Sequence, residues 1–290
     1  MTDPLSRRPA TVADVPVVHR LIAACEESLH GEVTTSADRV AVELGEPGSE
    51  AVVVLGPEGE AAGWGWVRGR RATVDVHPRH RGRGLGGSLL SWAEARATGD
   101  RLAQSVPHSD LAAIALLESR GYAPLVTEWL LEIATDVEPE VPAPAAGVTV
   151  RAFRDGDERA AYQVVEDAFD EWQQRRMPYE EWVRHTVGRE TFVAGASPVA
   201  FAGEEMVGAV LSTDGAEGRI QRVAVRRDQR GRGIARLLLL EAFRAFHRQG
   251  RRACTLWTHS DTGALALYER VGMTVRRSST VYSKVLTVTR

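Results

Sequence analysis

Two short stretches of the sequence place arginines and glycines at the spacing of an anion-binding turn. One reads RGRGIA from Arg230 to Ala235, and the other reads RGRGLG from Arg81 to Gly86. An apolar run that suits a helix follows each stretch. The first N–H groups of a helix have no partner within it, and the helix dipole adds positive charge there, so an anion is favoured. Because glycines let those amides approach a phosphate closely, the sequence predicts a pyrophosphate site in each half.

Other interpretations of these turns stay open but fit less well. Gly82, Gly84 and Gly87 match the glycine string of a dinucleotide-binding fold, but Arg236 replaces the third glycine in the second copy. Nucleic-acid binding through Arg-Gly repeats favours a basic domain with exposed aromatic residues, whereas the formal net charge here is −3. A surface turn whose arginines only contact water is the remaining alternative.

The two turns belong to an internal repeat. Residues 74–90 align without a gap with residues 223–239. Further along, HSDLAAIALLESRGY from His108 matches HSDTGALALYERVGM from His259. Self-similarity of this kind indicates repeated structural units, and here the unit is a whole domain.

The start of each half agrees as well. RPATVAD from Arg8 lies over RAFRDGD from Arg151, so three blocks recur in one order. We therefore expect one domain at 1–135 and a second at 148–290. The segment 136–147, DVEPEVPAPAAG, is rich in proline and favours an extended linker between them.

The composition is that of an ordinary globular protein. The 290 residues are 43% hydrophobic and 26% charged, which is enough for two domains with cores of their own. No run approaches the ~18 apolar residues that span a bilayer, and the N-terminal stretch MTDPLSRRPATVADVP has no apolar core of a signal peptide. Cys25 and Cys254 are too few for a disulfide framework. We therefore expect a cytoplasmic protein that binds neither membrane nor nucleic acid.

Each half is expected to form a mixed, mostly antiparallel sheet flanked by helices, which is an α+β fold. In the second half, the expected strands are 148–153, either 191–196 or 198–203, 205–213, 218–225, 253–258 and 281–286. The expected helices there are 158–169, which Asp157 caps, 178–187, 234–248 and 261–270. The Arg-Gly turn thus lies between a strand and a helix.

A second block completes a pattern that is more specific than the glycines alone. In the second half the pattern comprises Arg230, Gly233 and Ala235 in the turn, then Ala264, Tyr268 and Gly272 in a later helix. Arg-x-x-Gly-x-Gly/Ala after a strand, followed by Ala-x-x-x-Tyr-x-x-x-Gly, resembles the GCN5-related N-acetyltransferases. The resemblance covers nearly the whole chain as two tandem copies, a layout similar to that of the mycothiol synthases.

The resemblance implies an acetyl-CoA site in the second half. The pantetheine chain would enter between strands 223–225 and 253–258, and the pyrophosphate would meet the turn. Tyr268 would serve as general acid to the departing thiolate while a neutral amine attacks the thioester directly, without a metal. The coenzyme-binding residues that it implies there are Val223, Ala224, Val225, Arg230, Gly231, Arg232, Gly233, Ile234, Ala235, Arg236 and Asp261.

The first half departs from the family pattern where the chemistry needs it. Leu117 stands at the position of Tyr268 and cannot donate a proton, so the first half is predicted to be catalytically silent. A second acetyl-CoA in this half stays open, and the residues implied for it are Val74, Val76, Arg81, Gly82, Arg83, Gly84, Leu85 and Gly86. Asp110 and Asp261 stand where the family often has asparagine, which puts that coenzyme contact in doubt.

Residues 166–182 of the second half, which we expect on the acceptor side, mix aromatic and acidic residues. Trp172, Tyr179 and Trp182 lie among carboxylates, which suits a cationic amine through cation–π contact and charge pairing. An amphipathic helix with aromatics in the core is an equally good interpretation. The strand 218–225 lacks the glutamate base of many family members. Glu217 or His259 could relay a proton through water, but both also suit ordinary surface positions, and a weakly basic amine that is already partly neutral needs no strong base.

These observations favour an acetyl-CoA-dependent N-acetyltransferase that acts on the primary amine of a small molecule. The alternatives are a non-catalytic module that binds or senses acyl-CoA, and a protein or peptide N-acetyltransferase. The duplication allows either a monomer that pairs its own two domains or a homodimer.

Overall fold

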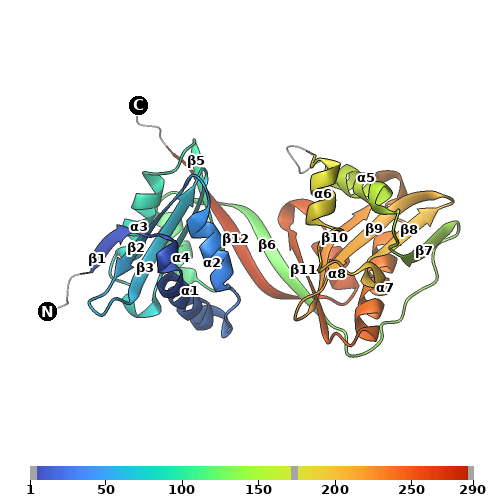
Figure 1. Cartoon of the computed structure of the whole chain (residues 1–290), viewed down its shortest axis with the longest axis horizontal. Coiled ribbons are helices and arrows are strands. Elements are labelled where there is room, and N and C mark those ends of the chain that lie inside the picture. Colours follow the sequence, from blue (N-terminus) through green and yellow to red (C-terminus); the bar gives the residue numbers. More distant parts are fainter. Residues whose placement is uncertain (1–4, 171–175, 287–290) are drawn as a thin grey trace. The chain divides into compact units, whose positions relative to one another are not determined.

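Strands and helices follow one another in the same order in both halves of the chain (Figure 1). The structure, a computed structural model, describes residues 5–170 and 176–286. The first half contains β1 (Ser6–Pro9), α1 (Val15–His30), α2 (Ala37–Gly45), β2 (Ser49–Leu55), β3 (Ala61–Arg68), β4 (Arg71–Val76), α3 (Leu85–Glu94), β5 (Arg101–Pro107), α4 (Leu111–Ser119) and β6 (Ala123–Ala134). The second contains β7 (Val148–Ala152), α5 (Glu158–Phe169), α6 (Tyr179–His185), β8 (Pro198–Ala202), β9 (Glu205–Thr213), β10 (Gly218–Val225), α7 (Ile234–Arg248), β11 (Ala253–His259), α8 (Leu265–Arg270) and β12 (Thr274–Val285).

The expected elements of the second half are present, and two of them begin several residues away from the expected start. Of the two alternatives for its second strand, Pro198–Ala202 forms. The helix expected from Asp261 begins at Leu265, because Ser260–Thr262 form a 3-10 turn that ends at Gly263 in the left-handed conformation. β12 begins at Thr274 and is therefore longer than expected.

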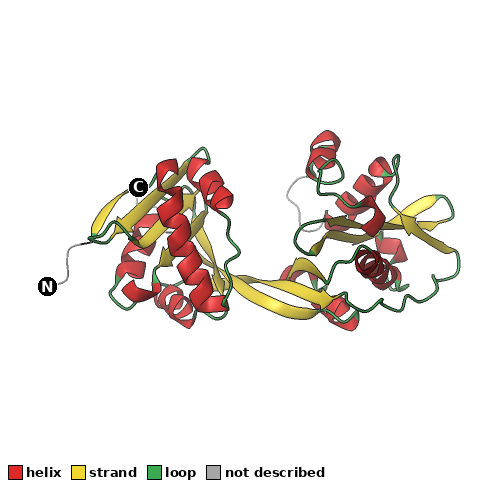
Figure 2. Cartoon of the chain, turned by 60° about the horizontal axis from the view of Figure 1, so that its bottom comes forward, coloured by secondary structure: helices red, strands yellow, loops and turns green. Residues whose placement is uncertain are grey.

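The sheet of the first unit runs in the order β1-β2-β3-β4-β5. All of these neighbours are antiparallel except β4 and β5, which are parallel. One face packs against α1 and α2 around the fully buried Trp64 and Leu21. The other face packs against α3 around Leu89 and Trp92, so the sheet lies between two helical layers (Figure 2).

The sheet of the second unit repeats this plan with β7-β8-β9-β10-β11. Only β10 and β11 are parallel among these neighbours. Helix α7 covers one face with an apolar stripe that includes Leu238, Phe243 and Phe246. Helices α5 and α6 cover the other face around Val165 and Trp182. The mixed sheet with flanking helices confirms the α+β prediction for both halves.

Each sheet is completed by a strand from the other half of the sequence. Residues 279–285 of β12 pair with β5, and residues 128–134 of β6 pair with β11, both antiparallel. The compact units are accordingly Met1–Thr127 with Ser279–Arg290, and Glu128–Ser278. The sequence predicts a boundary between the domains at 136–147. The compact units instead divide inside β6, between Thr127 and Glu128, and inside β12, between Ser278 and Ser279, so each of these long strands contributes residues to both units.

The segment 136–147 runs along the second unit, as its contacts with α7 and with the turn before that helix show (Figure 1). Arg248 Nη2 donates to Glu138 Oε1 (2.7 Å), and Arg232 Nη2 donates to the carbonyl oxygen of Ala146 (2.9 Å). Val141 packs against the core beneath α7. The prolines favour an extended backbone in this segment, and these contacts hold the segment against the second unit.

The same ion pair holds the entry to the first helix in each unit. Arg8 forms a bidentate pair with Asp14 (2.6 and 2.9 Å), and Arg151 forms one with Asp157 (2.6 and 2.8 Å). Asp157 is the N-cap residue as expected, but its carboxylate accepts from Arg154 N (2.8 Å) instead of from a helical N–H. The hydrogen bonds that the Arg8 guanidinium and the Thr11 N–H donate to the carboxylate lower the pKa of Asp14 to about 2.

No helix within residues 5–170 and 176–286 is long and apolar enough to cross a membrane.

Candidate active site

The strand before the Arg-Gly turn leaves its parallel neighbour in the second unit. Pairing between β10 and β11 runs from Gly218↔Cys254 to Ile220↔Leu256 and goes no further along β10. A bulge lies between Ile220 and Arg222, where the register to β9 shifts. Residues 223–225 therefore keep their pairing to β9 on one edge and have no ladder partner on the β11 side. This opening can accept an extended chain that hydrogen-bonds like an added strand.

The first unit has the same opening. β4 and β5 pair only at Arg71↔Ala103. Beyond that pair the side chain of Gln104 spans the gap, since its Nε2 lies 3.5 Å from the carbonyl oxygen of Val74. The strand separation expected at residues 223–225 is thus present, and the first unit has a counterpart that the side chain of Gln104 crosses. The aligned blocks place Thr255 at the position of Gln104 in the second unit, where its Oγ1 donates to the carbonyl oxygen of Gly218 (3.5 Å).

The two turns have the same backbone conformation. Gly231 and Gly233 have φ of 78° and 77°, and Gly82 and Gly84 have φ of 74° and 79°. This left-handed region disfavours any residue with a Cβ, so the glycines are required by conformation. Gly233 and Gly84 are the N-cap residues of α7 and α3, which leaves the first helical N–H groups at the turn.

The first arginine of each turn braces the turn instead of projecting from it. Arg230 Nε donates to the carbonyl oxygen of Val225 (3.3 Å), and Arg81 Nε donates to that of Val76 (3.2 Å). The guanidinium of Arg81 also lies 3.7 Å from Asp110 Oδ2. Arg232, in contrast, is exposed and contacts the linker through Ala146. Arg83 and Arg236 are exposed, so their charges are available to an anion at the turn.

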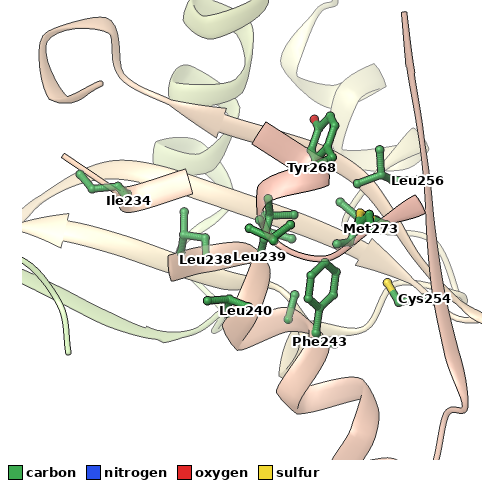
Figure 3. Close-up of a cluster of buried hydrophobic side chains, with 14 of the residues drawn as sticks. Ile234, Leu238, Leu239, Leu240, Phe243, Cys254, Leu256, Tyr268 and Met273 are labelled. Atoms are coloured by element: carbon green, nitrogen blue, oxygen red, sulfur yellow. The ribbon is translucent and has the colours of Figure 1, made fainter. Parts of the chain in front are cut away.

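Tyr268 lies at the edge of the core under α7 (Figure 3). Its ring packs in the cluster that contains Leu239 and Met273, and its hydroxyl points away from them. The residue is 8% exposed. Burial raises the pKa of the hydroxyl to about 12, and an interaction with Thr258 opposes this shift. The hydroxyl is therefore a neutral hydrogen-bond donor throughout the physiological range of pH.

The corresponding place in the first unit is apolar. Leu117 is 2% exposed and packs with Leu90, Tyr122 and Tyr282. Asp110, at the position where the family often has asparagine, accepts from Ala113 N (3.0 Å) as the N-cap of α4. Its counterpart Asp261 is exposed on a 3-10 turn, and Ser260 Oγ donates to it (3.3 Å).

The aromatic residues expected on the acceptor side take up different environments. Trp182 is 2% exposed and lies in the core between α5, α6 and the sheet. Tyr179 is partly buried, and the guanidinium of Arg159 already lies 3.6 Å from its ring centre. Trp172 lies outside the described residues. In this conformation Trp182 is a packing residue, and Tyr179 offers its ring face to an arginine of the chain.

The two groups expected to relay a proton also differ. Glu217 is paired with Arg276 (3.0 Å). His259 lies at the end of β11, and its Nδ1 is buried without a partner among the described residues. His259 is thus the freer of the two. In the part of the chain that the structure describes, no group of three or more histidine, cysteine or carboxylate side chains is placed to hold a metal.

Sequence reasoning missed a cavity of about 360 Å³ in the first unit. The glycine turn, β4, α3, β5 and α4 line it, including Asp75 and Gln104. Trp64 Nε1 donates to Asp75 Oδ2 (2.8 Å). Burial raises the pKa of Asp75 to about 6. The sequence signal for this cavity was a lone aspartate in the otherwise apolar strand end VDV, which lies shortly before the turn.

Comparison with known proteins agrees with this geometry. The model of the Acetyltransferase (GNAT) family matches residues 18–122 and again residues 158–273. The chain therefore belongs to this family and is an N-acetyltransferase with two tandem copies of the fold.

Individual relatives are similar along most of the chain. A mycothiol acetyltransferase of Thermobispora bispora is 26% identical over 91% of this chain and 94% of its own length. One of Streptomyces scabiei is 30% identical, covering 74% of this chain and 72% of its own. A GCN5-related N-acetyltransferase structure from Sphaerobacter thermophilus superposes with a TM-score of 0.82 at 34% identity, covering 98% and 97% of the two chains. A tandem GNAT protein from the clavulanic acid biosynthesis pathway, at 20% identity and a TM-score of 0.73, shares the fold. The resemblance to tandem family members is thereby confirmed.

Proposed function

We propose that the second unit transfers the acetyl group of acetyl-CoA to the primary amine of a small molecule. The observation that carries this proposal is Tyr268, a neutral donor whose hydroxyl interacts with Thr258 of β11, the strand that borders the opening beside β10. The turn 230–235 supports the same unit, because its left-handed glycines and free helical N–H groups suit a pyrophosphate.

The residues of the second unit have distinct tasks in this reaction. The free edge of residues 223–225 binds the pantetheine chain, and the turn orients the coenzyme. When bound, acetyl-CoA supplies an activated acyl group. Backbone N–H groups of β10 polarise the thioester carbonyl for attack by a neutral amine, and Tyr268 gives a proton to the departing sulfur. We assign the uptake of the amine proton, through water, to His259, whose Nδ1 has no partner among the described residues.

The class of the acceptor is inferred from the names of the relatives and from the environment of the aromatic residues on α6. Relatives that carry the name mycothiol acetyltransferase support a small-molecule acceptor. Trp182 in the core and Tyr179 under Arg159 do not form an open aromatic cage. We therefore do not assign amine recognition to Trp182 and Tyr179.

The first unit repeats the turn but lacks the acid. Gly82 and Gly84 have the conformation of their counterparts, which supports a second coenzyme molecule there. Leu117 supplies no proton, so we assign turnover to the second unit.

Initial rates of coenzyme A release with a panel of primary amines test the proposal. Tyr268→Phe keeps the ring and removes the proton, and it should lower kcat by about 100-fold or more. Tyr282→Phe, at a buried tyrosine of the first unit that is 7% exposed, is the control and should keep the wild-type rate. Equal rates for wild type and Tyr268→Phe would refute the role of Tyr268. Coenzyme binding without turnover on any amine would support a sensor instead.

A further inference from the structure

The bulge in β10 directs one arginine to the face of the second sheet that α5 and α6 cover. Arg222 follows the bulge and pairs with Leu211 of β9, which packs in the core under those two helices. Its guanidinium carbon lies 5.8 Å from the ring centre of Phe169 at the end of α5. Bulges near active sites often re-aim a side chain, and this one lies where the pairing between β10 and β11 ends. Arg222 therefore borders the opening, on the face opposite to α7.

The guanidinium of Arg222 has no carboxylate partner within residues 5–170 and 176–286. Its one hydrogen bond in that part of the chain runs from Nη1 to the carbonyl oxygen of Gln221 (2.9 Å), so the N–H groups of Nε and Nη2 are available to a ligand. The side chain is exposed, but the protein atoms around it lower the pKa of the guanidinium through desolvation. A cation in such surroundings attracts an oxyanion more strongly than a cation that is freely hydrated.

The carboxylate whose charge acts on Arg222 is directed to a different partner. Glu166 on α5 is 3% exposed, and its Oε2 accepts from the N–H of Met177 (3.1 Å). Its negative charge raises the pKa of Arg222 and so opposes the desolvation, but the two side chains form no salt bridge. Because Glu166 adds negative potential here, a singly charged carboxylate suits Arg222 better than a doubly charged phosphate.

An exposed tryptophan lies on the same face of the neighbouring strand. Trp257 is 54% exposed and follows Leu256, the last residue of β11 that pairs with β10. Side chains alternate between the two faces along a strand. Leu256 packs in the core under α7 and Thr258 interacts with Tyr268, so Trp257 lies on the opposite face. His259, two residues further on, shares that face with Trp257.

We propose that the acceptor amine of the second unit carries a carboxylate, as an amino acid does, that Arg222 binds this carboxylate, and that Trp257 covers the apolar part of the molecule. A guanidinium binds a carboxylate through two parallel N–H···O bonds. An indole ring supplies a large apolar contact surface. The inference rests on the proposed function and names the chemical class of its acceptor.

Binding through the carboxylate leaves the amino group of the acceptor free to react. The amine nitrogen bonds to the acetyl carbon as the bond from that carbon to sulfur breaks. The amine gives up one proton towards His259 and the sulfur receives one from Tyr268, so the products are an N-acetylated acid and coenzyme A. Arg222 holds the carboxylate equally before and during the transfer, and its contribution should therefore appear mainly in KM.

Initial rates of acetyl transfer to amino acids and to their amino alcohols test the proposal. The pairs are L-phenylalanine with L-phenylalaninol, L-leucine with L-leucinol, and β-alanine with 3-aminopropanol. Each alcohol keeps the primary amine and the carbon chain and replaces the carboxylate with an uncharged CH₂OH group. In at least one pair the acid should have a kcat/KM about tenfold or more above that of its alcohol, because the alcohol lacks the charge-assisted pair of hydrogen bonds.

Variants of two arginines on β10 locate the effect. Arg222→Gln should lower kcat/KM for the preferred acid by about tenfold or more, mainly through KM, and leave the matching alcohol unchanged. Arg219→Gln is the matched control, because Arg219 is also exposed but lies where β10 still pairs with Thr255 of β11. Trp257→Ala should raise KM for the acid and for the alcohol alike. Calorimetric titration with acetyl-CoA should give the wild-type affinity for Arg222→Gln, which shows that this variant is folded.

The possible results separate this inference from the proposed function. Equal kcat/KM within every pair, or the same loss for the acid in Arg219→Gln as in Arg222→Gln, would overturn the assignment of a carboxylate to Arg222 while acetyl transfer stands. Faster transfer to O-phosphoethanolamine than to β-alanine would overturn it in favour of a phosphate. Absence of transfer to every amine would instead overturn the proposed function, and this inference with it.

Discussion

Arg230 and Val225 close the Arg-Gly turn onto the strand before it. The Nε of Arg230 donates to the carbonyl oxygen of Val225 at 3.3 Å, and Arg81 makes the same bond to Val76 at 3.2 Å in the first unit. Both arginines also have the same backbone angles, φ −65° and ψ 160°. An arginine that sequence reasoning assigned to charge around a phosphate thus has a positional task in both copies.

Arg230→Lys should weaken acetyl-CoA binding to the second unit by about tenfold while the formal charge stays the same. A lysine ammonium is a point donor on a flexible stem and does not reproduce the rigid planar contact to Val225. Calorimetric titration with acetyl-CoA measures the change. Arg270→Lys, at an exposed site on α8, is the matched control, and an equal loss there would show that the effect is unspecific.

Gly233→Glu should abolish coenzyme binding at the second unit. The residue has φ 77°, which strains any side chain, and a carboxylate would repel the pyrophosphate. Gly203→Glu carries the same change at an exposed turn with φ 61°, so it measures the cost of backbone strain alone. If the site in the second unit survives in Gly233→Glu, the assignment of the turn is wrong.

Tyr282→Ala should loosen the first unit although the residue lies near the end of the sequence. Tyr282 is 7% exposed, packs with Leu90 and Val106, and lies on the part of β12 that pairs with β5. Removing a buried aromatic ring costs about 3 kcal/mol. Hydrogen exchange should speed up in β5 and leave β9 unchanged. Faster exchange in β9 alone would contradict the assignment of β12 residues 279–285 to the first unit.

Asp14→Asn should destabilise the first unit at neutral pH by about 1–2 kcal/mol. The folded-state pKa of Asp14 is lowered from 3.8 to about 2, chiefly by its hydrogen bond with Arg8. The stabilisation is present above the unfolded value and is lost as the pH falls through about 2. Urea unfolding of wild type and variant should therefore differ at pH 7 and converge near pH 2. A constant difference would show that the ion pair is not responsible.

Much of the fold could be predicted from the sequence, because the helix pattern, the glycine turn and the internal repeat all indicate the same order of elements. The apolar stripe from Ile234 to Arg248 predicts a helix, which is present with the expected bounds. The glycines at 231 and 233 predict a tight turn before it, and the structure shows both in the left-handed conformation. The duplication was visible in the aligned blocks. The family resemblance, which the family comparison confirms, depends on the turn and the Tyr268 helix together.

The exchange of strands was beyond sequence reasoning. β6 and β12 have alternating or apolar patterns that suit a sheet edge in either half, and nothing local says which sheet each strand joins. The domain boundary expected from the prolines of 136–147 therefore could not anticipate a division inside two strands.

The acceptor residues were the least predictable part. Trp182 and Tyr179 carry residue types that suit a cation, but the same types suit a core, and only packing distinguishes the two. Asp75 shows the reverse case. A single carboxylate between two valines looks ordinary until Trp64 and the surrounding carboxylates are placed around it.

The most direct measurement follows the acetyl group itself. The purified chain is mixed with carbonyl-labelled acetyl-CoA and a panel of primary amines, and mass spectrometry detects where the label goes. The account predicts one labelled amide for each coenzyme A released, at a rate that Tyr268→Phe lowers by about 100-fold or more. Coenzyme binding with no label on any amine, or transfer that Tyr268→Phe leaves unchanged, would contradict the assignment of acetyl transfer to Tyr268 and the second unit.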